Sequence, residues 1–242
     1  MIVLSVGMPR AGSGWHYNLI HDLMKTTGCD EARDIRERFH LKSILTEVNC
    51  NIGVLSLRRL GMVLIPALLG KTFVIKAHSA PTVWSRVLQH LGLLRITYIF
   101  RDPRDAMLSA YDYGRRALAR GRPNAFSHLS DFERTVAFMD VYVRIWEKWL
   151  GEKQTLITRY EDLLMDYDTE TQRLVEFLGL DGNKADIRDV IARYRPERAE
   201  EQKGLHFFKG KIGRFRDSYS QEEKELLAEH FGPYLRKMNY EI

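Results

Sequence analysis

The residues best suited to chemistry in this 242-residue chain lie near its amino terminus, in the stretch VGMPRAGSGWHYNLI. Gly7 and Gly12 keep the GxxxxG spacing of a phosphate-binding loop, but Ser13 and Gly14 stand where a nucleoside triphosphatase carries Lys and then Ser or Thr. A loop that ends a strand and opens a helix directs backbone N–H groups and the positive helix end at an anion. We therefore expect a phosphate-binding loop here, to which Arg10 contributes a fixed positive charge.

A second candidate for anion binding is the stretch ITYIFRDPRDAMLSAYDY. Arg101 follows an apolar run, Asp102 and Pro103 are typical of a helix start, and Ser109 lies eight residues beyond the arginine. Arg101 at a strand end and Ser109 two turns into the helix are placed to bind a second phosphate. An arginine at a strand end is salt-bridged about as often as it binds a ligand, and Asp102 and Asp105 are available partners.

Apolar periodicity indicates the elements that position these residues. Four short runs rich in β-branched and aromatic residues predict buried parallel strands at Ile2–Val6, Thr72–Lys76, Arg95–Phe100 and Thr155–Tyr160. Helical patterns cover Trp15–Thr26, Ala80–Leu91, Pro103–Arg120, Leu129–Leu150, Tyr167–Leu178, Lys184–Tyr194 and Gln221 to about Met238. The alternation predicts an α/β fold of three layers, similar to P-loop nucleotide-binding folds, with a central parallel sheet between helices. No repeat or linker divides the chain, so we expect residues 1–242 to form one domain.

Composition narrows the class of partner. A net charge of +5 and a pI of about 9.1 suit an anionic ligand, but acidic and basic residues are interleaved, and no nucleic-acid partner is indicated. The basic runs at 33–40 and 115–122 lack interleaved aromatic residues and favour solvated helix faces. Cys29 and Cys50 predict free thiols in a reducing compartment, and the first residues carry no secretory signal. We therefore expect a cytoplasmic protein.

Taken together, the two anion-binding stretches resemble the nucleotide-binding signatures of the sulfotransferases that use 3′-phosphoadenosine 5′-phosphosulfate (PAPS). The family's PKSGTTW-like loop binds the 5′-phosphosulfate, and Pro9-Arg10-Ala11-Gly12-Ser13-Gly14-Trp15 is similar to it. Its RxxxDxxxS-like segment binds the 3′-phosphate, and Arg101, Asp105 and Ser109 stand at the matching positions.

Three more stretches resemble the same family in the same order. VIKAHSAP is similar to its KTH strand end and places His78 on the general-base histidine, and RYEDLL is similar to its YED segment and places Tyr160 beside adenine. FFKGKIGRFRD is similar to its RKGxxGxW loop, which implies that Lys209 and Gly210 contact the 3′-phosphate while Phe208 stands where that loop has an arginine. The resemblance spans 7–217 and implies one sulfotransferase domain.

The resemblance implies in-line transfer of a sulfuryl group from PAPS to a hydroxyl or amine of a small-molecule acceptor, with release of adenosine 3′,5′-bisphosphate (PAP). Arg10 and Lys76 would stabilise the charge that develops on the leaving phosphate. His78 would accept the acceptor's proton, because an imidazole of ordinary pKa near ~6.5 is suited to this at neutral pH, and His16 is the reserve candidate. Trp15 and Tyr160 would contact adenine, although a tryptophan in the first turn of a helix is also good core material.

Three departures from the family pattern accompany these matches. Arg10 replaces a lysine, Gly14 replaces a hydroxyl residue, and Phe208 replaces an arginine for which Arg214 or Arg216 is the candidate substitute. Two other functions remain open: a nucleotide kinase or triphosphatase with a degenerate loop, and a non-catalytic nucleotide-binding module. The remaining histidines and the cysteines lack metal-ligand spacing, so no metal is expected.

The most apolar stretch runs from Gly53 to Gly70 and is interrupted by Arg58, Arg59 and Pro66. It is shorter than the ~20 apolar residues of a membrane-spanning helix, so no stable membrane insertion is expected. We expect a helix that covers the core or the acceptor cleft, with a segment lying on a membrane surface as the alternative. The rest of the segment from Cys29 to Leu69, like the helices around Tyr113–Phe138, matches no motif and would line the acceptor cleft in the fold that the resemblance implies.

Overall fold

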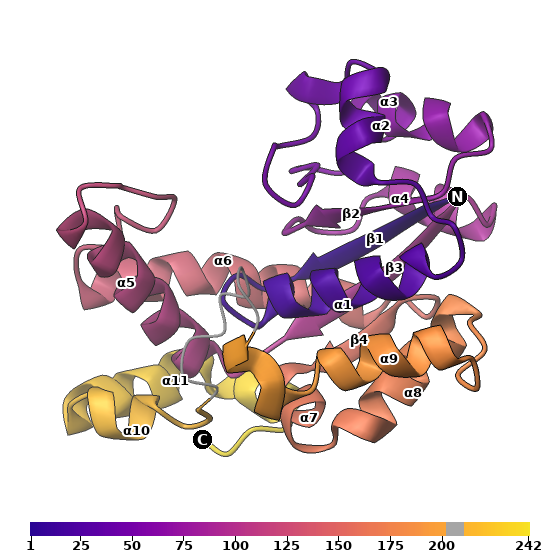
Figure 1. Ribbon diagram of the computed structural model, residues 1–242. Coiled ribbons are helices and arrows are strands. Elements are labelled where there is room, and N and C mark those ends of the chain that lie inside the picture. Colours follow the sequence, from indigo (N-terminus) through magenta and orange to yellow (C-terminus); the bar gives the residue numbers. More distant parts are fainter. Residues whose placement is uncertain (202–210) are drawn as a thin grey trace.

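A four-stranded parallel sheet occupies the centre of the molecule (Figure 1). The computed structural model describes residues 1–201 and 211–242. The strands are β1 (Ile2–Gly7), β2 (Phe73–Ala77), β3 (Leu94–Phe100) and β4 (Leu156–Arg159), in the order β2-β1-β3-β4. All four agree with the predicted strands to within a residue or two. β1 lies between β2 and β3 and is covered by helices on both faces, so its six residues are buried, which explains why they are all apolar or small.

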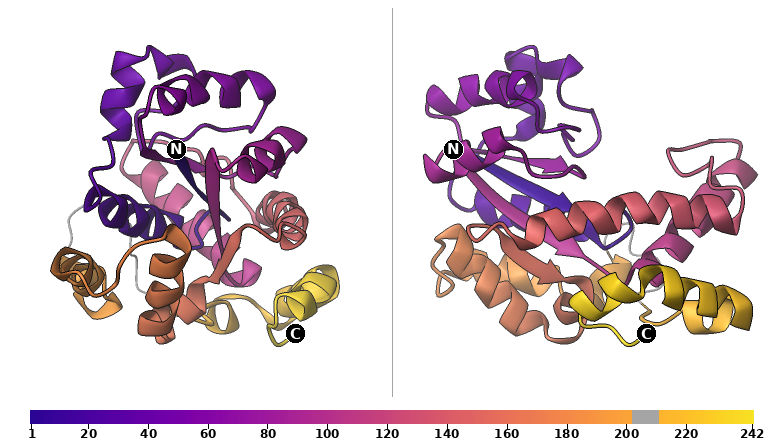
Figure 2. Two further views of the ribbon diagram at one scale, coloured as in Figure 1. Left: turned by 90° about the vertical axis from the view of Figure 1, so that its right-hand side faces the viewer. Right: turned by 180° about the vertical axis from the view of Figure 1, so that it is seen from behind.

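Helices cover both faces of the sheet, as Figure 2 shows from two further directions. On one face Ile2, Leu4 and Val6 belong to an apolar cluster that includes side chains of α3 (Leu57–Leu68), α6 (Phe132–Leu150) and α11 (Gln221–Lys237). On the other face Val3 packs in a second cluster with α1 (Ser13–Lys25), α7 (Tyr160–Met165), α8 (Tyr167–Leu178) and α9 (Ala185–Arg193). The predicted three-layer α/β arrangement is therefore confirmed.

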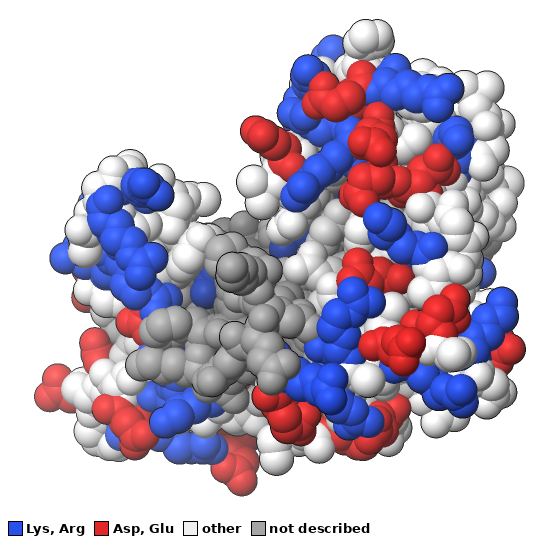
Figure 3. Space-filling model, in the orientation of Figure 1, with Lys and Arg blue, Asp and Glu red and all other residues white. Residues whose placement is uncertain are grey.

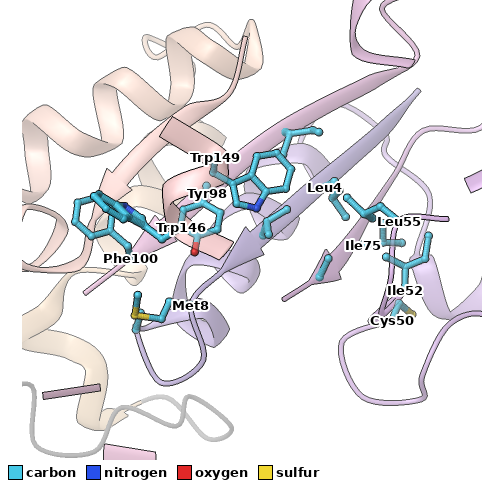
Figure 4. Close-up of a cluster of buried hydrophobic side chains, with 14 of the residues drawn as sticks. Leu4, Met8, Cys50, Ile52, Leu55, Ile75, Tyr98, Phe100, Trp146 and Trp149 are labelled. Atoms are coloured by element: carbon cyan, nitrogen blue, oxygen red, sulfur yellow. The ribbon is translucent and has the colours of Figure 1, made fainter. Parts of the chain in front are cut away.

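Large aromatic side chains join α6 to β3 (Figure 4). The rings of Tyr98 and Trp149 are 5.7 Å apart between centroids, and those of Phe100 and Trp146 are 5.6 Å apart. Trp149 also donates its indole N–H to the carbonyl oxygen of Ser79 at 3.0 Å. The core thus fixes the backbone just beyond the end of β2, where a candidate catalytic histidine lies.

Several helix starts differ from the predictions because local caps determine them. α4 begins at Val83 rather than Ala80, since Thr82 and Ser85 form a capping box. α6 begins at Phe132 rather than Leu129, since the Asp131 side chain accepts a hydrogen bond from the third helical amide. The predicted helix within Gly53–Gly70 is α3, which starts after the cap Ser56.

The remaining elements complete the carboxyl-terminal and peripheral parts of the fold. α5 (Pro103–Ala119) and α4 (Val83–His90) follow β3 and β2, as predicted. Short elements that were not predicted are α2 (Ala32–Arg38), α10 (Phe215–Ser218) and two 3-10 helices at Leu41–Ser43 and Pro196–Glu201; α7 was not predicted either. Within the described ranges no helix is both long and apolar enough to cross a membrane.

Candidate nucleotide and acceptor site

The glycine loop connects β1 to α1 through two residues in left-handed backbone conformations. Arg10 has φ 63° and Gly12 has φ 75°, after which α1 begins at Ser13. The first turn of α1 contains no acidic residue, so no side-chain carboxylate of that turn offsets the positive end of the helix dipole. The predicted strand, loop and helix are therefore present, with the geometry of an anion-binding helix start.

Gly12 is required for a second reason, which is the approach of an aromatic ring. A Cβ atom at this position would lie only 2.5 Å from Cδ2 of Tyr160, the first residue of α7. The Tyr160 ring meets the Trp15 ring edge-on at 6.2 Å between centroids. Trp15 is 3% exposed, stacks on Tyr167 at 6.0 Å and donates its indole N–H to the Tyr194 carbonyl oxygen at 3.0 Å. Trp15 is thus mainly a core residue that reaches the site at its margin.

These residues surround one cavity of about 470 Å³ at the carboxyl ends of the strands. In Figure 3 the surface is hollowed between the lobe of α5 and the lobe of α2 and α3. The predicted residues that line the cavity are Arg10, Gly12, Ser13, Gly14, Trp15, Lys76, His78, Arg101, Ser109 and Tyr160. The described lining includes Arg and Lys but neither Asp nor Glu, so the cavity favours an anion.

Burial makes the positive charges in this cavity costly in the absence of an anion. Desolvation, followed by repulsion from Arg10, lowers the pKa of Lys76 to about 8. Desolvation likewise lowers the pKa of Arg10 to about 10, with Arg116 and Arg101 adding repulsion. An anion placed between these groups would favour their charged forms and raise both pKa values again.

Arg10 is held by two contacts with α5. Its Nε donates to Ser109 Oγ at 3.3 Å, and its guanidinium carbon lies 4.3 Å from the centre of the Tyr113 ring. A cation over an aromatic face is electrostatically favourable and fixes the plane of the guanidinium group. The arginine that replaces the family's lysine is therefore positioned by the segment predicted to bind the second phosphate.

His78 lies just beyond β2 with one ring nitrogen bound to backbone. Its Nδ1 is 2.5 Å from the carbonyl oxygen of Gly7, and because a carbonyl only accepts, Nδ1 carries the hydrogen. In the neutral ring this leaves Nε2 as the proton acceptor. Desolvation, and then repulsion from Lys76, lowers the pKa of His78 to about 4, so the ring is neutral at pH 7.

Arg101 is engaged by protein groups, and its side chain also lines the cavity. One of its terminal nitrogens donates to Asp105 at 3.1 Å and to the Lys211 carbonyl oxygen at 2.8 Å, and its guanidinium lies 4.6 Å from the Tyr160 ring. Its buried Nε makes no hydrogen bond within the described part of the chain and lies 4.0 Å from a carboxylate oxygen of Glu161. Of the two carboxylates considered as partners, Asp105 pairs with Arg101, whereas Asp102 pairs with Arg104 at 2.8 Å.

Asp105 does more than pair with Arg101. Its carboxylate accepts hydrogen bonds from the backbone amides of Gly213 at 2.7 Å and Phe215 at 3.0 Å. It therefore attaches the chain that follows the carboxyl-terminal loop to the start of α5, next to Arg101. The predicted contacts of Phe208, Lys209 and Gly210 lie outside the described residues.

The structure places several of the predicted residues away from the cavity wall. Ala11 is fully buried outside the cavity wall, and its amide donates to the Met8 carbonyl oxygen. His16, the reserve base, is 0% exposed and faces Ser5 under the sheet, so it has no access to an acceptor. Neither candidate substitute for Phe208 lines the cavity: Arg214 pairs with Asp112 at 2.6 Å, and Arg216 pairs with Glu241 at 3.3 Å.

Part of the cavity wall had not been assigned. It consists of Pro9, Asn49, Tyr113, Ala125, Phe126, His128, Phe138 and Tyr142. Helical spacing held a signal for two pairs of these residues, because Ser109 and Tyr113 on α5, and Phe138 and Tyr142 on α6, are each four apart and share a helix face. Nothing local in the sequence distinguishes Asn49 or His128. Asn49, Tyr113 and Phe138 come from the regions expected to line the acceptor cleft.

Comparisons with known proteins identify the family and the fold. Residues 2–238 match the family model described as the sulfotransferase domain. A mouse sulfotransferase crystallised with PAP aligns with a TM-score of 0.62 at 17% identity, over 97% of this chain and 84% of that one. A retinol dehydratase crystallised with androsterone and the inactive cofactor PAP aligns with a TM-score of 0.59 at 19% identity, over 97% of this chain and 80% of that one. No curated protein matched the sequence. The family match over nearly the whole chain shows that this protein belongs to the sulfotransferase domain family of PAPS-dependent transferases.

Proposed function

We propose that this protein transfers the sulfuryl group of PAPS to a hydroxyl or amine of a small-molecule acceptor and releases PAP. The observation that carries the proposal is the single cavity in which Arg10, Lys76, His78 and Arg101 meet without a carboxylate in the described lining. These four side chains come from three separate parts of the chain, with Lys76 and His78 both at the end of β2, so their convergence is a property of the fold.

The residues present fit the nucleotide. The loop that ends at Gly12, with Arg10 and Lys76, would hold the 5′-phosphosulfate, because both cations are buried and gain from an anion. Arg101 and Ser109, which both line the cavity, would hold the 3′-phosphate. The Tyr160 ring, with the edge of Trp15, would contact adenine. Phe208, Lys209 and Gly210 remain part of this proposal through the family resemblance alone.

Bound PAPS supplies the sulfuryl group, and the chain's own residues supply charge stabilisation and a proton acceptor. Nε2 of His78 accepts the proton of the acceptor group, while the Gly7 carbonyl holds the ring in the required tautomer. Arg10 and Lys76 stabilise the negative charge that grows on the leaving phosphate. The protonated His78 is in turn stabilised by the phosphate charges that the cavity accommodates.

The unassigned wall of the cavity suggests the kind of acceptor. Tyr113, Phe126, Phe138 and Tyr142 present ring surfaces, and Asn49 and His128 add polar groups. We expect a small acceptor with an apolar or aromatic body that presents its hydroxyl or amine to His78.

The proposal is tested by calorimetric titration with PAP and by transfer of labelled sulfate from PAPS to a panel of alcohols, phenols and amines. Replacing His78 by Ala should lower transfer by ~10²–10⁴-fold and leave PAP affinity nearly unchanged, since the base acts on the acceptor. Exposed His90 on α4, replaced by Ala, is the matched control.

Three outcomes contradict the proposal. Normal PAP binding without transfer to any acceptor would identify a non-catalytic binding module. Magnesium-dependent binding of ATP in preference to PAP would identify a kinase or triphosphatase. Equal losses of PAP affinity and turnover in the His78 variant would remove the assignment of His78 as the base.

A further inference from the structure

Helices α3 and α4 expose two stripes of large apolar side chains beside the β2 edge of the sheet. On α3 the stripe contains Leu57, Ile65 and Leu68, which are 54%, 48% and 65% exposed and recur at helical spacing. On α4 it contains Val83, Trp84, Val87 and Leu91, the last being the residue that caps the helix, with exposures between 43% and 64%. Scattered exposed apolar residues are ordinary, but here seven lie on or at the end of two neighbouring helices, and together they are called the patch.

The two stripes run in the same direction along one corner of the molecule. Thr82, which caps α4, donates its hydroxyl to the carbonyl oxygen of Leu55, near the start of α3, at 2.8 Å. The two helices therefore begin side by side, and they are packed against each other. Because α3 leads into β2 and α4 leads out of it, both run from the site end of the sheet to the opposite end (Figure 2).

Charge distinguishes this patch from the rest of the chain. All 32 acidic residues lie outside the segment from Val48 to Arg101, which contains both helices. Arg58 is exposed next to Leu57 and forms no ion pair with another described residue. Arg86, exposed next to Val87, pairs with Glu152. The patch thus combines apolar side chains, a tryptophan and arginines without carboxylates of its own.

We propose that the α3–α4 face docks on a membrane surface that contains anionic lipids. Apolar side chains with a neighbouring arginine and a tryptophan are the combination that enters the headgroup region, where Arg58 meets lipid phosphates and Trp84 lies at the boundary. The absence of acidic residues removes the repulsion that an anionic surface would otherwise exert on these helices. The docking is peripheral, and it does not depend on the proposed transfer reaction.

The position of the patch gives the docking a consequence for the site. Only four residues separate His78 from the start of α4 at Val83, and Val48, 67% exposed, precedes the cavity-lining Asn49. The docked face therefore adjoins the acceptor end of the cavity. An acceptor that resides at the lipid surface would reach the cavity along this side.

Trp84 provides a direct readout of docking. It is 45% exposed, whereas Trp15, Trp146 and Trp149 are 3%, 1% and 0% exposed. On addition of phosphatidylglycerol-containing vesicles we expect tryptophan emission to shift to shorter wavelength and to be quenched by brominated lipid, with co-sedimentation of the protein. Vesicles of phosphatidylcholine alone should bind more weakly, since Arg58 then loses its anionic partners.

The variant Ile65→Glu/Leu68→Glu should lower vesicle partitioning by at least about tenfold, because it removes apolar contacts and adds repelled carboxylates. The matched control, Met165→Glu/Leu226→Glu, adds the same charge at sites on α7 and α11 that are 77% and 49% exposed. Its vesicle partitioning should fall much less than that of the test variant. Unchanged PAP affinity and an unchanged circular dichroism spectrum establish that each variant is folded. Arg58→Glu, at an exposed side chain, is a second test and should also lower partitioning into anionic vesicles.

The proposal is overturned if the wild-type protein shows neither co-sedimentation nor a Trp84 shift with anionic vesicles. It is also overturned if the control and test variants lose partitioning equally. A dimer that sediments as such and is broken by Ile65→Glu/Leu68→Glu, with no vesicle binding by the wild type, would assign the face to a second copy of the chain instead.

Discussion

Binding of PAP should be linked to protonation of Lys76. This side chain is 6% exposed in a cavity that it shares with Arg10, and its pKa is lowered from 10.5 to about 8. Phosphate groups in the cavity would offset both causes of that shift, namely the lost hydration and the neighbouring guanidinium. The nucleotide should therefore bind the protonated lysine far better than the neutral lysine.

The expected magnitude follows from the two pKa values. If PAP returns the pKa of Lys76 to about 10.5, then at about pH 9 roughly nine-tenths of the lysine is neutral before binding and nearly all is protonated afterwards. Binding should then take up about 0.9 proton, and affinity should fall by about 80-fold as pH rises from about 8 to 10.5. The loss occurs on the alkaline side, because deprotonation removes the favourable charge.

Calorimetric titration with PAP in buffers of different ionisation enthalpy measures the proton uptake directly, without knowledge of the acceptor. In Lys76→Arg the side chain stays charged, so uptake at about pH 9 should fall by about 0.9 proton, which is the contribution of Lys76. Lys71→Arg is the control, since Lys71 pairs with Asp30 and does not line the cavity. Zero uptake in the wild type, or equal uptake in the wild type and Lys76→Arg, would refute the reasoning.

Three further predictions concern the glycine loop, the second phosphate and the core. Gly12→Ala should lower PAP affinity more than tenfold, because the added Cβ would contact Tyr160. Gly28 also has positive φ but faces open space, so Gly28→Ala should lose about 1 kcal/mol of stability and keep its PAP affinity. Equal PAP affinities of the two variants would contradict this. Arg101→Ala should weaken PAP by roughly 2–5 kcal/mol in calorimetry, and a change below about 1 kcal/mol would exclude a phosphate contact. His16, with a pKa lowered to about 3 by burial, is neutral when folded and protonates on unfolding, so stability should fall as pH falls. His16 should lower the free energy of unfolding, measured with urea, by about 2 kcal/mol as pH falls from about 7 to 5. The same pH dependence in His16→Leu would disprove this.

The sheet could be predicted because its signal is local. β1 is buried on both faces, so each of its residues is apolar or small, and the run ends at the glycine where the backbone must turn. Helix starts were less accurate because a single side chain decides them. Asp131 and Thr82 cap α6 and α4, so both helices begin three residues inside the predicted starts, where the apolar pattern alone gives no boundary.

The site was predicted where the fold brings motif residues to one edge, and it was mispredicted where neighbours decide burial. Arg101 and His78 meet at one cavity because parallel strands end at the same edge. His16 also follows the glycine loop, yet the helix period turns its ring toward Ser5 and the core. The aromatic wall from α5 and α6 depends on how two helices cross, which no motif encodes.

Arg10, which stands where the family's loop has a lysine, makes contacts that link the two anion-binding segments. Its Nε donates to Ser109 Oγ, so one side chain joins the loop for the first phosphate to the segment for the second. A hydroxyl that accepts from an arginine still has its own hydrogen to donate, and Ser109 can therefore bind a phosphate while it positions Arg10. A lysine could neither stack its charge flat on Tyr113 nor keep further donors directed at the cavity in a fixed plane. The substitution thus couples the two halves of the proposed nucleotide site, and a ligand that fills only one half should bind with much less than half of the free energy.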